Sequence, residues 1–440
     1  MLMQGKYLPV VFIALFFMAA CGFLGNNSDV SATPATATAT LDSSTPLPAG
    51  TPNASVPITS TENNLTVTVW LPPEIATRTE AGADVWEQQW LAFRSAHPDV
   101  TLTVEQKNVS GPGGILNYLR TGRNVAPSVL PDLIALPTNQ LAAAANEELI
   151  YPVGDWLDDE LAEDLYPAAK RLGQIDENLI GYPFALFNLS HFAYHSELLT
   201  NTLPLTWDDM ITNVEAQFVF PASGSSGASL LLQFYLASGG EVVNENEQLA
   251  LQLEPLTNAL IQFDGAQSNN FLAAASSSMT TVDEAWQLFQ SNSSLIVLTT
   301  AGQFLRLRSD DFMPSFAPIP GLEEPLIPLL DGWAWAISTP DPARRALALE
   351  LLAILTTDKN LGEWSYASNM LPAQRGAFAF WPAEDAYTLF VQNELEEADA
   401  FPSAVNSDLL TIFQNALLDV ISLGMSPQAA AEEAVMTLQP

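Results

Sequence analysis

The sequence predicts an α/β fold that contains a parallel sheet. A β-branched run at 65–70 is followed by Trp86, Trp90 and Phe93 at helical spacing, and then by a second β-branched run at 100–106. A strand, a helix and another strand in this order are the unit from which parallel sheets are built. The aromatic face of the helix is expected to pack into the core.

Strands and helices keep alternating along the chain. The pattern predicts strands at 130–137, 182–199 in part, 293–300 and 325–338, with a turn at Asp331–Gly332, and helices at 115–121, 139–150, 205–218 and 342–357. Thr206 is the expected N-cap of the third of these helices, and Trp207 is expected to pack rather than bind ligand. The residues 224–227, GSSG, predict a flexible turn.

Composition limits the function classes. Hydrophobic residues make up 48% of the chain, with 10 Trp and 22 Phe, so a large core and more than one domain are expected. Lys and Arg number 14 against 50 Asp and Glu, which gives a formal charge of −36. A phosphate backbone is repelled by such a field, so nucleic-acid binding is excluded.

The N-terminus predicts a lipoprotein signal peptide at 1–20. Lys6 precedes an apolar stretch that is too short to span a bilayer but long enough for the core of a secretory signal. Ala19 and Ala20 precede Cys21, the single cysteine, in a pattern that resembles a bacterial lipobox with Met18 where Leu is more usual. The resemblance implies cleavage before Cys21 and its diacylation; the alternative is a plain cleavable signal with an incidental cysteine.

Residues 21–64 differ in composition from the rest. After Cys21 they are rich in Ser, Thr, Ala and Pro and carry few large apolar side chains. Such a segment cannot bury enough surface to offset the entropy of ordering, so it predicts a solvated tether between lipid and folded domain.

Motifs of catalysis are absent from the sequence. It has no G-x-S-x-G, H-E-x-x-H or Walker loop. His191 and His195 stand four apart, but their segment is predicted to begin as a strand and only His97 is left as a third imidazole. The acidic cluster at 156–167 lacks the glycine of a calcium loop. We therefore expect no catalytic residues, no cofactor and no metal.

The order of these segments resembles the extracellular solute-binding proteins of ABC importers, in particular the sugar-binding family that includes maltose-binding proteins. The matching stretches are LTVTVW, PDLIALPTNQLAAAANEELIYPVGDWL, LYPAAKRLGQIDENLIGYPFALFNLSHFAYHSELL, PLTWDDM, LIVLTTAGQF, DGWAWAISTPDPARRALALELLAILTT and GEWSYASNMLPAQRGAF. The resemblance implies two α/β lobes joined by a hinge, with a ligand in the cleft between them. The expected lobes are 65–183 with about 294–333, and 184–293 with about 334–440.

The resemblance also implies a set of ligand contacts in loops that face this cleft. Ligands of open parallel sheets sit beyond the carboxyl ends of the strands, where Trp70 and Asn139 lie. Asn139 is equally a plausible helix N-cap. Phe187 departs from the polar residue that relatives often carry at its position, and Gln303 departs from their Gly-Pro-Trp pattern. The expected ligand-binding residues are Trp70, Asn139, Phe187, Gln303, Trp333, Tyr366 and Asn369.

Two functions of different classes follow. The first is capture of a solute, most simply a carbohydrate, for delivery to an ABC permease and its ATPase by a monomer that is lipid-anchored on the outer face of the cell membrane. The second is a surface-anchored polysaccharide hydrolase or carbohydrate-adhesion module. A perturbed pair of carboxylates in the cleft would favour the hydrolase, whereas a two-lobe cleft lined by aromatic side chains, without such a pair, would favour solute capture.

Overall fold

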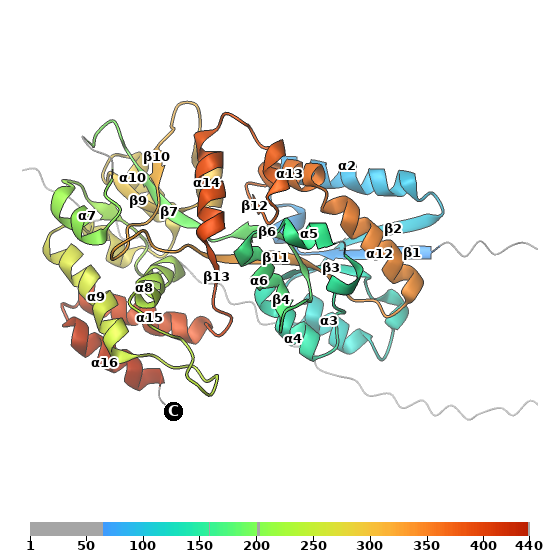
Figure 1. Cartoon of the computed structure of the whole chain (residues 1–440), viewed down its shortest axis with the longest axis horizontal. Helices are drawn as coiled ribbons and strands as arrows, with labels where there is room; N and C mark the ends of the chain where they lie inside the picture. The colour runs from blue at the N-terminus through green and yellow to red at the C-terminus, as the bar shows by residue number, and fades with distance from the viewer. Residues whose placement is uncertain (1–64, 158, 200–202, 439–440) are drawn as a thin grey trace, which may run out of the picture. The chain divides into compact units, whose positions relative to one another are not determined.

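A seven-stranded sheet forms around the N-terminal β-α-β unit. The computed structural model describes residues 65–157, 159–199 and 203–438 (Figure 1). β1 (Leu65–Leu71) pairs in parallel with β2 (Val100–Gln106) and, on its other side, with β3 (Leu133–Pro137). The predicted parallel unit is confirmed.

The first sheet is completed by strands from later parts of the chain. Its order is β12-β6-β11-β3-β1-β2, and β13 also pairs with β11. β11 runs antiparallel to both β3 and β6. The bounds of the added strands are β6 Tyr182–Phe187, β11 Leu329–Ile337, β12 Leu371–Pro372 and β13 Asp399–Ala400.

Helices cover both faces of the first sheet. Side chains alternate across the strands, so Val67, Val69 and Leu133 pack with α2, whereas Trp70 and Ile134 pack with α3 and α4. Figure 1 shows α2, α12 and α13 on one side of the sheet and α3 and α4 on the other. The bounds are α1 Pro73–Ala76, α2 Glu80–Ala96, α3 Ile115–Gly122, α4 Leu141–Asn146, α5 Asp159–Glu163, α6 Pro167–Gly173, α12 Pro342–Leu355 and α13 Asp358–Ala367.

The aromatic face predicted for α2 is buried. Trp86 and Trp90 are each 3% exposed and stack with their ring centroids 5.2 Å apart. Trp86 also meets Trp335 of β11 edge to face and lies 4.7 Å from the ring of Trp364 on α13. These ring contacts pack α2 against residues of β11 and α13 that lie more than 240 positions later in the sequence.

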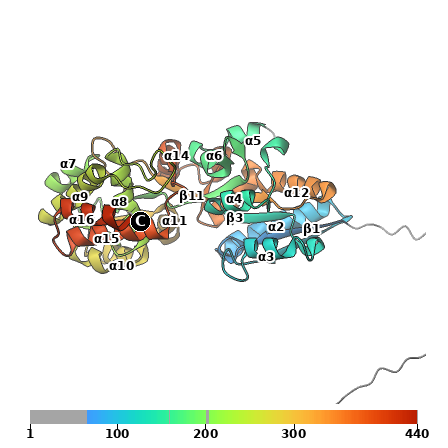
Figure 2. The same ribbon diagram turned by 90° about the horizontal axis from the view of Figure 1, so that it is seen from below.

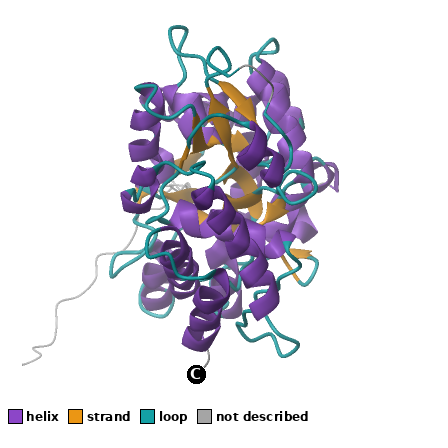
Figure 3. Cartoon of the chain, turned by 90° about the vertical axis from the view of Figure 1, so that its left-hand side faces the viewer, coloured by secondary structure: helices purple, strands orange, loops and turns teal. Residues whose placement is uncertain are grey.

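A second sheet has the order β10-β7-β9-β8. β9 lies antiparallel to β7 and parallel to β8, and β10 pairs with the other edge of β7. Figure 3 shows the strands enclosed by helices. The bounds are β7 Ser190–Tyr194, β8 Phe218–Val219, β9 Ile296–Thr300, β10 Ser315–Ala317, α7 Trp207–Asn213, α8 Ser225–Ala237, α9 Leu253–Ser268, α10 Val282–Gln290, α11 Ala301–Leu307, α15 Ser407–Ile421 and α16 Pro427–Leu438.

Short elements fill the connections. Thr206 caps α7 as predicted, because its side chain accepts from the backbone N–H of Asp209, and Trp207 is fully buried. No helix among the described residues is both long and apolar enough to cross a membrane. The remaining elements are the hairpin β4 Gln174–Ile175 and β5 Asn178–Leu179, and the 3₁₀ helices 127–129, 138–140, 154–156, 274–278 and 376–380.

The chain passes between the sheets in the segments 188–189, 318–328 and 401–406. The first is the shortest: only Asn188 and Leu189 separate β6 of the first sheet from β7 of the second. Asn188 adopts φ 66°, a left-handed conformation that Asn tolerates better than most residues. The chain thus passes from the first sheet to the second within two residues.

Helix α14 (Ala386–Glu397) lies between the elements of the two sheets (Figures 1 and 2). Its Tyr387 stacks on Phe304 of α11 with centroids 4.2 Å apart, and its hydroxyl lies 2.8 Å from Nε2 of His191 on β7. The helix also contacts α6, which packs on the first sheet. It therefore links the two halves of the structure in addition to the three chain crossings.

Strand pairing differs from the expected lobe boundaries. The segment 294–333 is expected in the first lobe, yet β9 and β10 pair with β7 of the second sheet. The segment 334–440 is expected in the second lobe, yet α12 and α13 pack on β1 and α2. The local sequence shows that a segment forms a strand, but not which strands it pairs with. A buried apolar strand such as β9 has a composition that suits either sheet, and its partners are set by the tertiary fold.

Two local predictions are corrected. The Asp331–Gly332 turn does not form, because β11 runs through both residues. A Cβ at position 332 would lie 3.0 Å from the Ala185 carbonyl oxygen, so glycine serves close strand packing there. The residues 224–227 are not a free turn either: Gly224 is the N-cap of α8, which begins at Ser225.

Candidate ligand-binding cleft

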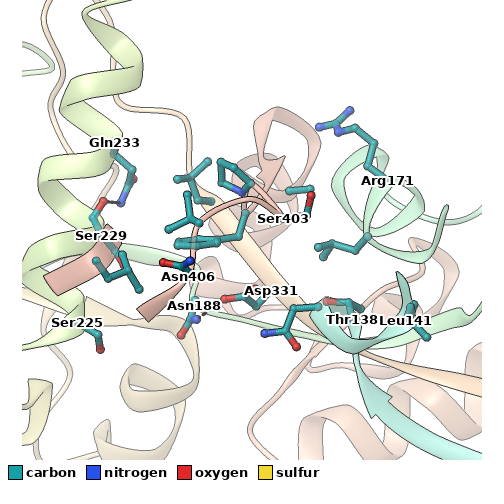
Figure 4. A pocket seen from close by; sticks show the side chains of 18 of the residues that line it. Thr138, Leu141, Arg171, Asn188, Ser225, Ser229, Gln233, Asp331, Ser403 and Asn406 are labelled. Carbon is teal, nitrogen blue, oxygen red and sulfur yellow. Dashed lines mark hydrogen bonds between the residues drawn. The ribbon is translucent and has the colours of Figure 1, made fainter. Parts of the chain in front are cut away.

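A cavity of about 700 Å³ opens between elements of the two sheets (Figure 4). It is referred to below as the central cavity. Hydroxyl and amide side chains are the most numerous in its lining, and apolar side chains make up much of the rest. The polar lining residues are Thr138, Asn139, Arg171, Gln174, Asn188, Ser190, Ser225, Ser226, Ser229, Gln233, Thr300, Asp331, Ser403, Asn406 and Ser407; the larger apolar ones are Leu141, Leu172, Ile175, Leu329, Phe401, Val405 and Leu410.

Asp331 and Asn188 lie together where the first chain crossing meets β11. Asp331 is opposite Phe187 in the antiparallel register of β11 and β6, which brings it next to the crossing residue Asn188. Nδ2 of Asn188 donates to Oδ2 of Asp331 over 2.9 Å. Burial raises the pKa of the Asp331 carboxyl above its ordinary value, and the Asn188 hydrogen bond opposes this only in part. The carboxylate is thus a strong acceptor with spare capacity.

One face of α8 supplies a row of polar groups. Ser225, Ser229 and Gln233 are four residues apart, so their side chains project from the same side of the helix toward the central cavity (Figure 4). Gln233 is only 6% exposed. Its Nε2 donates to the Ser229 carbonyl oxygen at 3.3 Å, while its Oε1 receives no hydrogen bond from the described residues. This oxygen is a buried acceptor without a partner among the described residues.

The opposite wall comes from the first sheet. Thr138 and Asn139 directly follow β3, and Thr138 Oγ1 accepts from the backbone N–H of Gly332 at 3.2 Å. Arg171 of α6 lies at the rim, where its Nη2 is 2.7 Å from Oδ1 of Asp399 and also donates to the Ala398 carbonyl oxygen. Its positive charge is therefore already balanced by a carboxylate.

The third crossing closes the remaining side. Phe401 is the single aromatic residue of the described lining. Asn406 is the N-cap of α15, and its Oδ1 accepts from the backbone N–H of Leu409 at 2.9 Å. The central cavity therefore receives residues from three crossings or their neighbours, so a ligand in it would contact segments attached to both sheets.

Of the seven predicted ligand contacts, Asn139 lines the central cavity. Trp70 is 4% exposed and packs edge-on against Tyr118, with Lys107 Nζ 5.2 Å from its ring. Phe187 ends β6 and packs against the first core. Neither of these two rings is part of the described lining, and both stay predictions.

The other four predicted contacts lie elsewhere as well. Gln303 is buried in α11, where Nε2 donates to Asp283 and Oε1 accepts from Thr299 at 2.6 Å, so its hydrogen-bonding capacity is largely used. Trp333 is in β11 and 8% exposed. Tyr366 and Asn369 lie at the end of α13. Cys21 falls outside the described residues.

The sequence held a signal for the residues that were missed. The spacing of Ser225, Ser229 and Gln233 marks a polar stripe on a helix whose other residues are mostly apolar. Because 224–227 are predicted to form a turn, Ser225 is not recognised from the sequence as the first residue of this stripe. Asp331 was hidden in the same way by the interpretation of Asp-Gly as a turn.

The described residues contain no group of three or more His, Cys, Asp or Glu that could hold a metal ion. His191 is buried between Phe192 and Tyr387, and His195 Nε2 lies 2.9 Å from the Phe289 carbonyl oxygen. The chemistry offered by the central cavity is instead that of hydrogen bonding, with one carboxylate, Asp331, that forms no ion pair with a cation among the described residues.

Solved structures share this fold. The sugar-binding protein MalE of Xanthomonas citri has a TM-score of 0.69 and 17% identity over 85% of this chain and 96% of its own. The cyclic alpha-maltosyl-1,6-maltose binding protein of Arthrobacter globiformis has a TM-score of 0.66 and 16% identity over 85% and 98%. MalE of Listeria monocytogenes, in complex with maltose, has a TM-score of 0.62 and 17% identity over 85% and 97%. At these identities the likeness shows the fold.

The family follows from the sequence itself. No curated protein matches the chain. The family model described as bacterial extracellular solute-binding protein matches residues 91–389, more than half of the 440 residues. With a fold shared with two-lobed binding proteins and a polar cavity between its two sheets, the chain belongs to the family of bacterial extracellular solute-binding proteins.

Proposed function

We propose that this protein is the substrate-binding component of an ABC importer and that it captures a carbohydrate in the central cavity. The observation that carries this proposal is the lining: hydroxyl and amide groups from both sheets surround a space of about 700 Å³. This volume is within the range of small-molecule sites. Sugars present many hydroxyl groups, each of which needs a partner when it leaves water.

The names of the structural neighbours support the same ligand class. Those of Xanthomonas citri, Listeria monocytogenes and Arthrobacter globiformis are described as binding sugar, maltose and a cyclic maltose derivative. In our proposal the first lobe comprises 65–187 and 329–400 and the second 188–328 and 401–438, following strand pairing. Closure of these lobes about the crossing segments would enclose the ligand, and the closed form would dock on the permease.

An extracellular solute-binding protein acts outside the cytoplasm. We propose further that Cys21 is acylated after cleavage of 1–20, and that the Ser/Thr/Ala/Pro-rich tether holds a monomer at the outer face of the membrane. Two or more acyl chains give stable anchoring, which one chain does not. Mass spectrometry of the mature N-terminus would reveal the lipid.

The hydrolase alternative receives less support. Glycoside hydrolysis ordinarily uses two carboxylic groups that flank the scissile bond. The described lining of the central cavity contains one carboxylate, Asp331. Its partner Asn188 offers an amide rather than a second acid. Capture without chemistry is therefore the function that this cavity supports best.

A bound sugar is expected to stabilise the purified full-length chain. At about a hundredfold excess over Kd, the free energy of unfolding should rise by about 2.7 kcal/mol, because ligand binds only the folded state. A thermal-shift screen with mono- and oligosaccharides, polyols and peptides measures this. Stabilisation by peptides and by none of the sugars would contradict the carbohydrate proposal.

Replacing Gln233 with leucine is expected to raise the Kd of the bound sugar about tenfold, because the substitution removes a polar side chain from the cavity lining. Folding stability should change little, since the substitution removes a buried oxygen that lacks a partner together with the long hydrogen bond from Nε2 to the Ser229 carbonyl oxygen. Gln287→Leu, at an exposed position of α10, is the matched control and should leave affinity unchanged. Titration calorimetry of both variants tests this, and an unaltered Kd for Q233L would remove Gln233 from the site.

A further inference from the structure

The charges around the central cavity are unevenly balanced. Its described lining has two charged side chains, Arg171 and Asp331. Arg171 is paired with Asp399 over 2.7 Å. Asp331 accepts a hydrogen bond from the neutral amide of Asn188, and none of the cations among the described residues forms an ion pair with it. The cavity therefore offers one uncompensated negative charge.

The same fold neutralises a buried carboxylate elsewhere. Asp132 is fully buried, and Arg344 approaches it with Nε 2.9 Å from Oδ1 and Nη2 2.9 Å from Oδ2. A buried charge is normally paired in this way, because desolvation without a partner is costly. Asp331 faces the central cavity without such a partner, so a cation supplied by the ligand would complete the pattern.

Other acidic groups near Asp331 further favour a cationic ligand. A neighbouring cavity shares Gln233, Leu329, Ala400 and Pro402 with the central cavity, and its lining carries Glu323 and Glu324 besides the Asp399 that pairs with Arg171. The whole chain has a formal charge of −36. A field of this sign attracts cationic solutes and repels anionic ones.

The remaining lining limits what kind of cation fits. Serine hydroxyls of α8 and the amides of Asn139 and Asn406 are suited to a ligand with many hydroxyl groups. Phe401 is the one aromatic ring available for stacking among the described residues. A simple aliphatic amine would leave most of these polar groups unmatched.

We propose that the captured carbohydrate is an amino sugar whose protonated amine forms an ion pair with Asp331. This inference rests on the proposed capture of a carbohydrate and adds the substrate class and the residue that selects it. The ammonium group replaces the missing cation beside Asp331, and the sugar hydroxyls are bound by the serine and amide groups of both walls. No covalent step is involved.

The test uses matched sugars that differ in one substituent on each ring. Titration calorimetry of the purified full-length chain at about pH 6.5, where amines carry a proton, compares glucose with its 2-amino, 3-amino and 6-amino derivatives. It also compares cellobiose with the fully deacetylated and the N,N′-diacetylated disaccharides of glucosamine. We expect at least one amine to bind about tenfold or more tightly than its hydroxyl counterpart, since charge-assisted hydrogen bonds are the stronger ones.

The variant Asp331→Asn tests whether Asp331 causes the preference for the amine. It keeps the shape of the side chain and an oxygen that can accept from Asn188, and its melting temperature checks that it folds. The preference for the amine should disappear in D331N, because the loss of the carboxylate charge should weaken binding of the amine far more than binding of the neutral sugar. Asp264→Asn, at an exposed position of α9, is the control and should retain the preference.

The remaining outcomes separate the two proposals. If neutral sugars bind as tightly as their amines, the amino-sugar inference is overturned and the proposed carbohydrate capture stands. A preference for amines that persists in D331N overturns the role of Asp331. If no sugar of the panel binds, both proposals fail.

Discussion

Replacing Arg344 with methionine is expected to lower the free energy of unfolding by about 3–5 kcal/mol near neutral pH. The substitution keeps most of the aliphatic volume of the side chain but removes the cation that pairs with Asp132, which is fully buried. The Thr68 backbone N–H donates to Oδ2 of Asp132 and would remain as a partner. Urea denaturation of the purified chain measures the loss.

The pH dependence of this loss has a definite sign. Burial already raises the pKa of Asp132 despite the opposing effects of the Thr68 N–H and Arg344. Without Arg344 the pKa rises further, so the folded variant takes up a proton more readily. The stability difference between variant and parent should therefore shrink as the pH falls, because the protonated carboxyl needs no cation.

Arg94→Met is the matched control for Arg344→Met. Arg94 is also a helical arginine with a carboxylate partner, since its Nη1 lies 3.2 Å from Oε1 of Glu87, but 38% of its side chain and 60% of that of Glu87 are exposed. Exposed pairs contribute about 0–1 kcal/mol. Equal losses in the two variants would show that Asp132 does not depend on Arg344 for its charge.

Acidification is expected to destabilise the protein through His191 by up to about 3 kcal/mol. Nδ1 of this buried imidazole donates to the Phe192 carbonyl oxygen at 3.1 Å, so Nε2 accepts from the hydroxyl of Tyr387. Burial lowers the pKa of His191 from 6.5 to about 4. Between pH 6.5 and about pH 4, His191 is protonated in the unfolded chain but neutral in the folded chain. Stability is thus fully retained above pH 6.5 and is lost as the pH falls toward 4.

Urea denaturation across this pH range measures the effect in the parent, in His191→Gln and in Tyr387→Phe. H191Q should lack this contribution to the acid slope, whatever its stability at neutral pH. Y387F removes the hydroxyl but leaves the imidazole buried, so its slope should remain close to that of the parent. Equal slopes in H191Q and in the parent would show that another group accounts for the acid loss.

Much of the fold could be predicted because its signals are local. β2 has the expected bounds, β1 extends one residue further, and the N-cap of Thr206 is confirmed. The Asp-Gly pair in β11 is the instructive exception. A turn is its usual role, but in this chain Gly332 permits close packing against β6, which no local pattern reveals.

The site was predicted less completely. The rule that ligands lie beyond strand ends led to Asn139, which does line the central cavity. It gave no means of finding Asp331, which is the third residue of a strand, or Gln233, which is two turns inside a helix. Both residues face the cavity because of how β11 and α8 are placed against the crossing at Asn188. Trp70, Phe187, Gln303, Trp333, Tyr366 and Asn369 stay predictions.

The sequence by itself determined the α/β class, the membership of the solute-binding family and the acidic, lysine-poor character of the chain. These depend on periodicity, on the order of segments and on composition, all of which are written along the chain. Only the tertiary structure decided that β9 joins the second sheet, that Asp132 has Arg344 as its cation and that Asp331 has none. These facts depend on which distant segments come into contact. The sequence around a carboxylate does not show which side chain the fold will place beside it.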